Sequence, residues 1–169
     1  YNLTLDNAPF AEGNKKGVSD ILSGMLGNGT ETVTKDAYNE EIDFLGADIN
    51  FYASGASANG LSRYSKRILE LMADGALNPL FDQKEFEKEK EKIIEGLKSD
   101  EKSVTAIARR VENVLTFGKE HYKGEFTSEE NLKNVTLDDV VMNYNTYFVP
   151  ANAYLVIVGD VNFKEVKKE

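Results

Sequence analysis

The sequence predicts an α+β fold in which one sheet of about four strands is packed by a second layer of helices. Residues 48–54 alternate between apolar and polar side chains, as a half-buried strand does. Residues 153–158 form an unbroken apolar run, which is typical of a strand buried on both faces or at the centre of a sheet. Elsewhere apolar residues recur with helical spacing in long consecutive stretches, and this grouping favours α+β over a regular alternation of strands and helices.

The first part of the chain contains one strand and two helices. Tyr1–Leu5 alternates like a strand, and the helix that follows it ends at Asn28-Gly29. The apolar face of that helix comprises Val18, Ile21, Leu22, Met25 and Leu26. Thr34 is the expected N-cap of a second helix, which ends at Leu45 with Gly46 as its C′ residue.

After the strand at 48–54, the sequence predicts a turn at Gly55–Gly60 and a short returning strand at Leu61–Tyr64. A helix follows and ends before Pro79, because the residue before a proline avoids helical geometry. The residues of this helix that are expected to face inward are Ile68, Leu71, Met72 and Ala76.

Helices dominate the remainder of the sequence. A charged helix spans Asp82–Lys98, a second helix is closed by Gly118, and a third begins with a capping box formed by Thr136 and Asp139. A final helix begins near Phe163. The apolar faces are Phe86, Ile93, Ile94 and Leu97 in the first helix, Val104, Ile107, Ala108, Val111, Val114 and Leu115 in the second, and Leu137, Val140, Val141, Tyr144, Tyr147 and Phe148 in the third.

Composition excludes several classes of function. The chain has 169 residues, 41% of them hydrophobic and 29% charged, which is typical of one globular domain. Its net charge of −9 disfavours nucleic-acid binding. The absence of cysteine excludes disulfides and thiolate–zinc sites, and no apolar run approaches the roughly 18 residues that a membrane span needs.

No catalytic constellation is visible in the residues themselves. His121 is the single histidine, and a zinc site without cysteine normally needs two or more histidines with a carboxylate. His121 lies in a polar stretch after a predicted helix, so we interpret it as a structural or surface residue. No nucleophile elbow and no phosphate-binding glycine motif is present.

Several segments, in this order and spacing, resemble the M16 family of zinc peptidases, which includes pitrilysin, insulinase and mitochondrial processing peptidase. Gly17–Thr30 is similar to a family stretch of the form Gly-Leu-Ala-His-x-x-Glu-His-Met-Leu-x-x-Gly-Thr. Leu45–Asn50 and Asn78–Lys90 follow at the family's spacing. The stretch Asn131–Val161, which contains Tyr147–Ala153, carries the most specific similarity.

The resemblance implies an M16 metallopeptidase-like (LuxS/MPP-like) half-domain with a mixed sheet, four of which typically enclose a chamber. Active members hold zinc with the two histidines of His-x-x-Glu-His and a later glutamate, and the glutamate inside the motif activates water. Aligned on Gly17 and Met25, the two histidine positions of this chain are Asp20 and Gly24, and the base position is Ser23.

The third ligand position falls on Gly96, or on Glu95 if the register shifts by one residue. We therefore expect no catalytic residue, no metal ligand and no cofactor in this chain, with zinc held by a catalytic partner half. Asp20 together with Glu95 would bind a cation only weakly, because two oxygens without an imidazole make a poor zinc site.

Three interpretations of function stay open. The chain is a non-catalytic module that completes the chamber or holds peptide for a zinc-binding half, or a structural subunit with no role in proteolysis, or one half of a protein whose other half carries the intact motif. In active members an edge strand receives the substrate by β-augmentation. The corresponding residues here are Asn50, Phe51, Tyr52, Ala53 and Ser54, for which an ordinary sheet strand is the alternative interpretation.

The resemblance also sets the expected context. Expected partners are another M16-like half-domain or subunit and a peptide, with neither nucleic acid nor a membrane span. Residues 1–169 are expected to form one half-domain excised from a longer chain, since the sequence opens on a strand already under way. Non-catalytic relatives in bacteria favour the periplasm or cell envelope as location.

Overall fold

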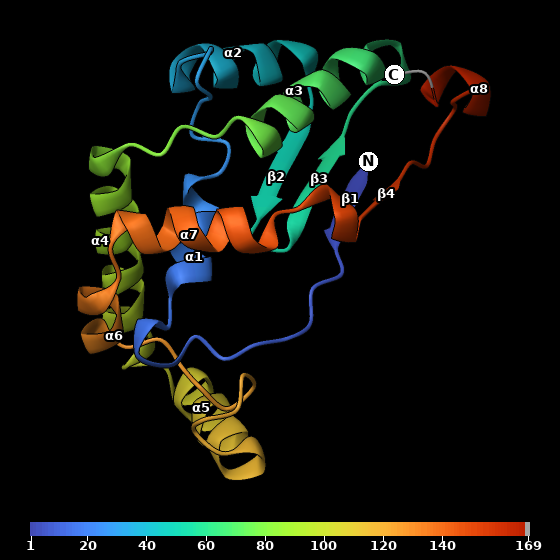
Figure 1. Ribbon diagram of the computed structural model, residues 1–169. Helices are drawn as coiled ribbons and strands as arrows, with labels where there is room; N and C mark the ends of the chain where they lie inside the picture. The colour runs from blue at the N-terminus through green and yellow to red at the C-terminus, as the bar shows by residue number, and fades with distance from the viewer. Residues whose placement is uncertain (168–169) are drawn as a thin grey trace. The chain divides into compact units, whose positions relative to one another are not determined.

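The computed structural model describes residues 1–167, and the chain forms two compact units (Figure 1). The first, which we call the sheet unit, comprises Tyr1–Asp6, Gly24–Leu80 and the segment from Phe148 onward. The second, the helical unit, comprises Asn7–Ser23 and Phe81–Tyr147. The boundary runs through one helix, α1, so that helix contributes to both units. The expectation of a single excised half-domain stays a prediction.

The sheet unit is built on an antiparallel sheet. Its strands are β1 (Asn2–Leu5), β2 (Asp48–Tyr52), β3 (Gly55–Asn59) and β4 (Ala153–Val156), in the spatial order β2-β3-β1-β4. Every pairing between these described strands is antiparallel. The resemblance implied a mixed sheet, and that expectation is wrong for these strands. The α+β class is confirmed, and β2 and β4 are the two edges of the sheet.

Two helices pack against this sheet, α2 (Lys35–Leu45) and α3 (Ser65–Leu77). Thr34 caps α2 as predicted, because its side chain accepts a hydrogen bond from the N–H of Ala37. Gly46 ends the helix in the left-handed conformation, with φ of 59°. The buried core between the helices and the sheet consists of Tyr38, Leu45, Ala56, Ala58, Ile68, Leu71 and Met72. Shorter elements of this unit are η2 (Ser62–Tyr64), η3 (Pro150–Asn152) and α8 (Phe163–Val166).

The predicted hairpin is wrong in its position. Ala53 and Ser54 form the turn, and the returning strand is Gly55–Asn59, whereas Ser62–Tyr64 is a 3-10 helix and not a strand. Gly55 explains the error, because a Cβ at this position would lie only 2.0 Å from the carbonyl oxygen of Leu3. This glycine allows β3 to start in close contact with β1, and the sequence pattern had assigned it to a loop.

The prediction that residues 153–158 form a central or doubly buried strand is also wrong. The strand β4 ends at Val156 and lies at the edge of the sheet. Tyr154, Leu155 and Val156 remain 61%, 46% and 53% exposed. An apolar run shows that the strand carries no charge. It does not show whether other strands or helices lie beside the strand and bury it.

The helical unit contains α4 (Gln83–Asp100), α5 (Val104–Phe117), α6 (Glu129–Asn134) and α7 (Leu137–Tyr147), with the short η1 (Gly13–Lys15). The helix α1 (Val18–Met25) joins it through its first residues. The predicted capping box of α7 is confirmed, since the N–H of Thr136 donates to Asp139 at 2.9 Å and the N–H of Asp139 donates to the Thr136 hydroxyl at 3.3 Å. The most deeply buried side chains of this unit include Ile21, Leu22, Phe86, Leu132, Val135 and Val140.

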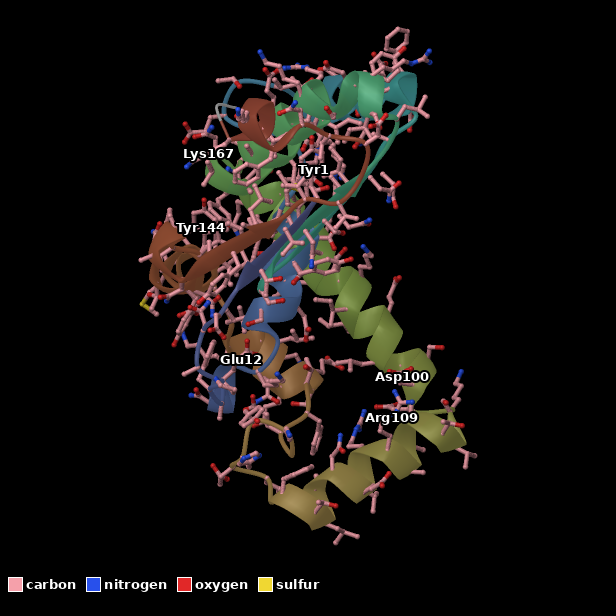
Figure 2. The ribbon with its side chains drawn as sticks, turned by 90° about the vertical axis from the view of Figure 1, so that its right-hand side faces the viewer. Tyr1, Glu12, Asp100, Arg109, Tyr144 and Lys167 are labelled. Carbon is pink, nitrogen blue, oxygen red and sulfur yellow. The ribbon has the colours of Figure 1, made fainter. Side chains whose placement is uncertain are left out.

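Helix α5 forms where the sequence predicts it and ends at Gly118, but its apolar face is open. Val104 and Leu115 are 82% and 81% exposed. The half-buried side of the helix carries Val114 of the predicted face together with Arg110, whose guanidinium lies 4.8 Å from the centre of the Phe126 ring. Figure 2 shows Arg109 on this helix and Asp100 at the end of α4.

Among residues 1–167, no helix combines the length and the apolar character that crossing a bilayer requires.

Candidate functional site

The candidate peptide-binding residues lie in and after β2, which is an edge of the sheet (Figure 1). Asn50, Phe51 and Tyr52 are in the strand, whereas Ala53 and Ser54 form the turn to β3. The register pairs Tyr52 with Gly55. The structure therefore places three of the five predicted residues where a peptide strand could be added and two at the end of that edge.

The hydrogen bonds of the sheet define which main-chain groups of β2 face outward. The N–H of Leu5 donates to the carbonyl of Ser54 and the N–H of Ala58 donates to the carbonyl of Tyr1, both at 2.9 Å. Bonded pairs alternate along an antiparallel ladder. The residues of β3 that bond to β2 are therefore Gly55, Ser57 and Asn59, opposite Tyr52, Asn50 and Asp48. The main-chain groups of the intervening residues, Ile49 and Phe51, point to the open edge.

The position of β2 is fixed by the ring of Phe51, which fits between two glycines. A Cβ at Gly27 would lie 2.6 Å from Phe51 Cδ2, and a Cβ at Gly75 would lie 2.6 Å from Phe51 Cζ. The same Cβ at Gly75 would be 2.7 Å from the hydroxyl of Tyr38. That hydroxyl donates to the carbonyl of Leu71 at 2.7 Å, and burial, together with nearby carboxylates, raises the pKa of Tyr38 far above its usual range.

The exposed face of β2 is polar. The Asp48 carboxylate accepts hydrogen bonds from the side-chain amides of Asn50 at 3.1 Å and Asn59 at 3.2 Å. Tyr52 extends from the same face and is 49% exposed. The side chains of Ile49 and Phe51 on the other face pack against the core of the sheet unit. One face of β2 thus packs against the core of the sheet unit, and the other face presents polar groups to solvent.

The positions that correspond to the zinc motif lie on α1. Asp20 is exposed, and its carboxylate accepts a hydrogen bond from the Thr127 hydroxyl at 3.1 Å. The Ser23 hydroxyl donates to the carbonyl of Ser19 at 2.7 Å, within the same helix. Gly24 provides no side chain. These positions therefore supply one carboxylate and one hydroxyl that is engaged by the helix backbone.

The candidates for the third ligand lie on α4. Glu95 and Gly96 are both exposed, and a Cβ at Gly96 would meet no atom within 4 Å. Within residues 1–167, no three histidine, aspartate or glutamate side chains are grouped so that they could hold a metal ion. This set of donors does not fit a catalytic zinc ion, which needs three histidine, cysteine or carboxylate ligands and leaves a fourth position for water.

A buried network holds the first turn of α1, and Figure 2 labels its central residue, Glu12. The Glu12 carboxylate accepts hydrogen bonds from the N–H groups of Gly17 at 2.8 Å and Ser19 at 2.9 Å, so it caps the helix. Glu125 accepts from the N–H of Glu12 at 3.0 Å, and Lys16 Nζ lies 3.4 Å from both carboxylates. Burial acts to raise the pKa of Glu12, but the hydrogen bonds and the Lys16 charge outweigh it and hold that pKa below its usual value.

The sequence does not predict this network, because Glu12 and Glu125 are 113 residues apart and no local pattern links them. The single histidine plays no part in it. His121 is exposed after α5, and its ring stacks on Phe117 with the ring centres 5.4 Å apart. Its Nδ1 accepts a hydrogen bond from the N–H of Lys123 at 3.2 Å, which is consistent with a surface residue.

Comparison with known proteins gives a consistent result. Residues 9–124 match the sequence profile of insulinase, peptidase family M16. The chain is 26% identical over 161 residues to an uncharacterized zinc protease, YmxG, of Bacillus subtilis, and the match covers 90% of this chain and 39% of that protein. It is 21% identical over 165 residues to a probable mitochondrial-processing peptidase subunit beta of Arabidopsis thaliana, covering 95% of this chain and 31% of that protein. The chain therefore spans about two fifths or less of the length of these relatives.

Solved structures share the fold. A protease from Helicobacter pylori superposes with a TM-score of 0.82 at 18% identity, over 99% of this chain and 42% of that one. An inactive domain of peptidase M16 from Pseudomonas fluorescens superposes with a TM-score of 0.85 at 21% identity, again over 99% of this chain and 42% of the other.

Proposed function

Because this chain belongs to the insulinase family, peptidase family M16, we propose that it is a non-catalytic half-domain that pairs with a zinc-binding half or subunit. In this role it completes the chamber and holds an extended peptide along β2. Zinc and the catalytic base belong to the partner half. The observation that carries the proposal is the combination of family membership with motif positions that hold Asp20, Ser23 and Gly24.

The chemistry of α1 supports the non-catalytic part of the proposal. A water-activating base must carry a group that takes up a proton, and the Ser23 hydroxyl at the base position donates to its own helix instead. Gly24 has no donor atom for a metal, and Asp20 alone cannot replace two imidazoles. A relative described as a zinc protease is 26% identical to this chain over 161 residues, but the residues here are those of a half that leaves the chemistry to its partner.

The geometry of β2 supports the peptide-holding part. The main-chain groups of Ile49 and Phe51 face the open edge, so an extended peptide could pair with them as an added strand. The ring of Phe51, fitted between Gly27 and Gly75, holds that edge in place without relying on the peptide. A preformed edge lowers the entropy cost of binding. Asn50 to Ser54 are the residues that the peptide would lie along.

Mixing experiments test the proposal directly. The purified chain is titrated into a zinc-loaded M16 subunit that keeps His-x-x-Glu-His, and cleavage of a quenched fluorogenic peptide is followed. We expect the chain alone to cleave nothing and the mixture to cleave faster than the subunit alone. Binding of a fluorescent form of the same peptide to the chain is measured in parallel by anisotropy.

A pair of variants isolates the role of β2. Ile49→Pro removes an outward N–H, which an edge strand tolerates, and it blocks an added strand. We expect it to weaken peptide binding and the stimulation of cleavage by about tenfold, equivalent to about 1.4 kcal/mol. Ile49→Ala keeps the N–H but loses the same packing against the core, so it serves as the matched control.

Two outcomes would contradict the proposal. Cleavage by the chain alone that a chelator abolishes would show that a metal site exists outside the matched motif. Absence of both stimulation and peptide binding would instead leave a structural subunit with no role in proteolysis.

A further inference from the structure

Helix α5 turns its basic face towards a pocket of the helical unit. The pocket has a volume of about 290 Å³, and its walls come from α4, α5 and residues 124–127. The wall from α5 consists of residues three or four positions apart, which share one face of a helix: Ala106, Arg109, Arg110 and Asn113. The most exposed apolar residues of α5, Val104 and Leu115, are not among them. The helix therefore directs charge inward and apolar surface outward, the reverse of a usual amphipathic helix.

The two arginines of this pocket have no carboxylate partner. Arg67 shows how an arginine of this chain is otherwise satisfied, because its guanidinium pairs with two glutamates. Within residues 1–167, neither Arg109 nor Arg110 forms an ion pair. Arg110 lies over the ring of Phe126, at 4.8 Å from its centre, and a ring face uses few of the five N–H donors of a guanidinium. Most donors of both groups are consequently available to a ligand.

The charges around the pocket leave one positive charge in excess. Two carboxylates line it, those of Asp100 and Glu125. Glu125 is already engaged, since it accepts from two backbone N–H groups at 3.0 Å and lies 3.4 Å from Lys16 Nζ. A further carboxylate, that of Asp20, accepts from the hydroxyl of Thr127 in the pocket wall. Among the described residues that line the pocket, Asp100 is thus the one carboxylate left to oppose two guanidinium groups (Figure 2).

We propose that this pocket binds one carboxylate group of a polypeptide through Arg109 and Arg110, with the side-chain amide of Asn113 as a further donor. A planar guanidinium presents paired N–H donors whose spacing matches the two oxygens of a carboxylate. One negative charge balances the excess of the pocket. A phosphate dianion fits less well, because Asp100 and the net charge of −9 oppose its second charge.

The carboxylate can have one of two sources. A bound peptide can supply it from its C-terminus or from an acidic side chain. A further part of the polypeptide to which this chain belongs can also supply it, since the matched relatives are longer than this chain. The chemistry at the arginines is the same in both cases. The site lies wholly in the helical unit, so the proposal does not depend on the role proposed for β2.

Three acetylated peptides of glycine and serine, which differ only in their carboxylates, serve as probes. The first has a free C-terminal carboxylate and an internal glutamine. The second has a C-terminal amide and a glutamate at the same internal position, and the third has the amide and the glutamine. The side-chain N–H signals of Arg109, Arg110 and Asn113 are followed by NMR. We expect the first two peptides to shift these signals, and the third to bind at least about tenfold more weakly.

Two pairs of variants make the test specific. Arg109→Gln should weaken binding of the carboxylate peptides about fivefold to tenfold, whereas Arg63→Gln removes the same charge from an exposed position of the sheet unit and should not. Asp100→Asn removes the group that competes for the arginines and should tighten binding about twofold to fivefold. Its control is Glu101→Gln at the next residue. All four side chains are exposed, so thermal unfolding should be the same in every variant.

The same titration on a longer polypeptide that contains this chain identifies the source. A response of the Arg109 signal to the carboxylate peptides there would assign the carboxylate to a bound peptide. A signal that already has the shift of the bound state, and that no longer responds, would assign it to the rest of the polypeptide. Either result supports a carboxylate at the arginines.

Four results would overturn the proposal. In the chain alone, these are an absence of response at the arginine signals, equal binding of all three peptides, and equal weakening by Arg63→Gln and Arg109→Gln. The fourth is tighter binding of inorganic phosphate than of either carboxylate peptide. Because no zinc subunit enters this assay and no residue of β2 lines the pocket, failure here leaves peptide holding at β2 untouched. Failure of stimulation at β2 would likewise leave the result at the arginines standing.

Discussion

The two edges of the same sheet have opposite surfaces. In β2, Ile49 and Phe51 pack into the core of the sheet unit while Asp48 and Asn50 face solvent, so each side chain matches its surroundings. In β4, Tyr154 and Val156 are as exposed as the polar residues of β2 but have no polar group apart from one phenol. The apolar side chains of the first edge are packed within this chain, and those of the second edge remain exposed.

On the proposed function, this difference suits the two edges to different neighbours. A strand that is amphipathic and stabilised by its own core can gain or lose a neighbour at little cost, which suits a peptide that comes and goes. A strand that is apolar on both sides gains stability from a lasting neighbour through the hydrophobic effect.

The outward groups of β4 follow from the alternation of the ladder. The N–H of Asp6 donates to the carbonyl of Asn152 at 2.8 Å, so these two residues are a bonded pair. Alternation from this pair makes Tyr154 and Val156 the residues that bond to β1. The main-chain groups of Leu155 consequently point away from β1.

The largest effect is expected from proline placed at residues that bond into the sheet. Asn50→Pro and Tyr154→Pro each remove a ladder hydrogen bond and leave a carbonyl of the neighbouring strand without its donor. We expect each to lower the free energy of unfolding by about 2–3 kcal/mol in urea titrations. Ile49→Pro and Leu155→Pro, whose N–H groups point outward, should cost less than about 1 kcal/mol beyond the loss of side-chain packing, which Ile49→Ala and Leu155→Ala measure.

These proline variants test the alternation from which the outward groups of both edges are assigned. If Ile49→Pro exceeds Ile49→Ala by as much as Asn50→Pro exceeds Asn50→Ala, the outward groups of β2 have been assigned to the wrong residues. The same comparison of Leu155→Pro with Tyr154→Pro applies to β4. Agreement at one edge and disagreement at the other would confine the error to a single strand.

A smaller effect is expected from closing the space that holds Phe51. Gly75→Val places a side chain where a Cβ would already be 2.6 Å from Phe51 and 2.7 Å from the Tyr38 hydroxyl, so the ring and β2 must shift. We expect a loss of about 1–3 kcal/mol, as overpacking typically costs, with faster amide exchange in β2 than in β4.

Gly96→Val is the matched control for this change, because it alters another helical glycine whose Cβ would meet nothing within 4 Å. Valine is a better helix former than glycine, so stability should stay the same or rise by a few tenths of a kcal/mol. Equal destabilisation by the two variants would show that helix propensity accounts for the loss, and not the closing of the space that the Phe51 ring occupies.

Much of the fold could be predicted from sequence because its signals are local. The N-cap at Thr34, the left-handed Gly46 and the capping box at Thr136 each involve residues within one turn, and each is confirmed. The hairpin after β2 was misplaced because Gly55 responds to the approach of Leu3, which is distant in sequence. The short helix α6 was not predicted, since six residues carry too little periodicity.

The candidate site could be predicted less completely. The sequence pointed to β2 through resemblance, and the structure adds that β2 is an edge whose outward groups belong to Ile49 and Phe51. The apolar run that contains β4 was correctly identified as a strand. An apolar pattern favours burial, but it does not show whether other elements of the fold bury the strand. The cap formed by Glu12 and Glu125 depends on a contact across 113 residues, which periodicity cannot reveal.

The smallest expected effect concerns the one charge on the β2 edge. Asp48→Ala removes an exposed carboxylate that accepts bonds from Asn50 and Asn59, so stability should change by less than about 0.5 kcal/mol. Binding of a peptide with lysine near the carboxylate should weaken up to about fivefold, the range of an exposed ion pair. A matched peptide with glutamine at the same position should bind both forms equally.

Salt dependence then separates the two edges. Binding of the lysine peptide at β2 should weaken as salt is added, because exposed charge pairs are screened, and Asp48→Ala should remove that dependence. A peptide bound at β4 would lie beside a strand whose one ionisable group is the phenol of Tyr154, so its binding should not respond to Asp48→Ala. If the salt dependence of the lysine peptide is the same with and without the Asp48 carboxylate, that peptide is not bound along β2, and β2 is not the edge that holds it.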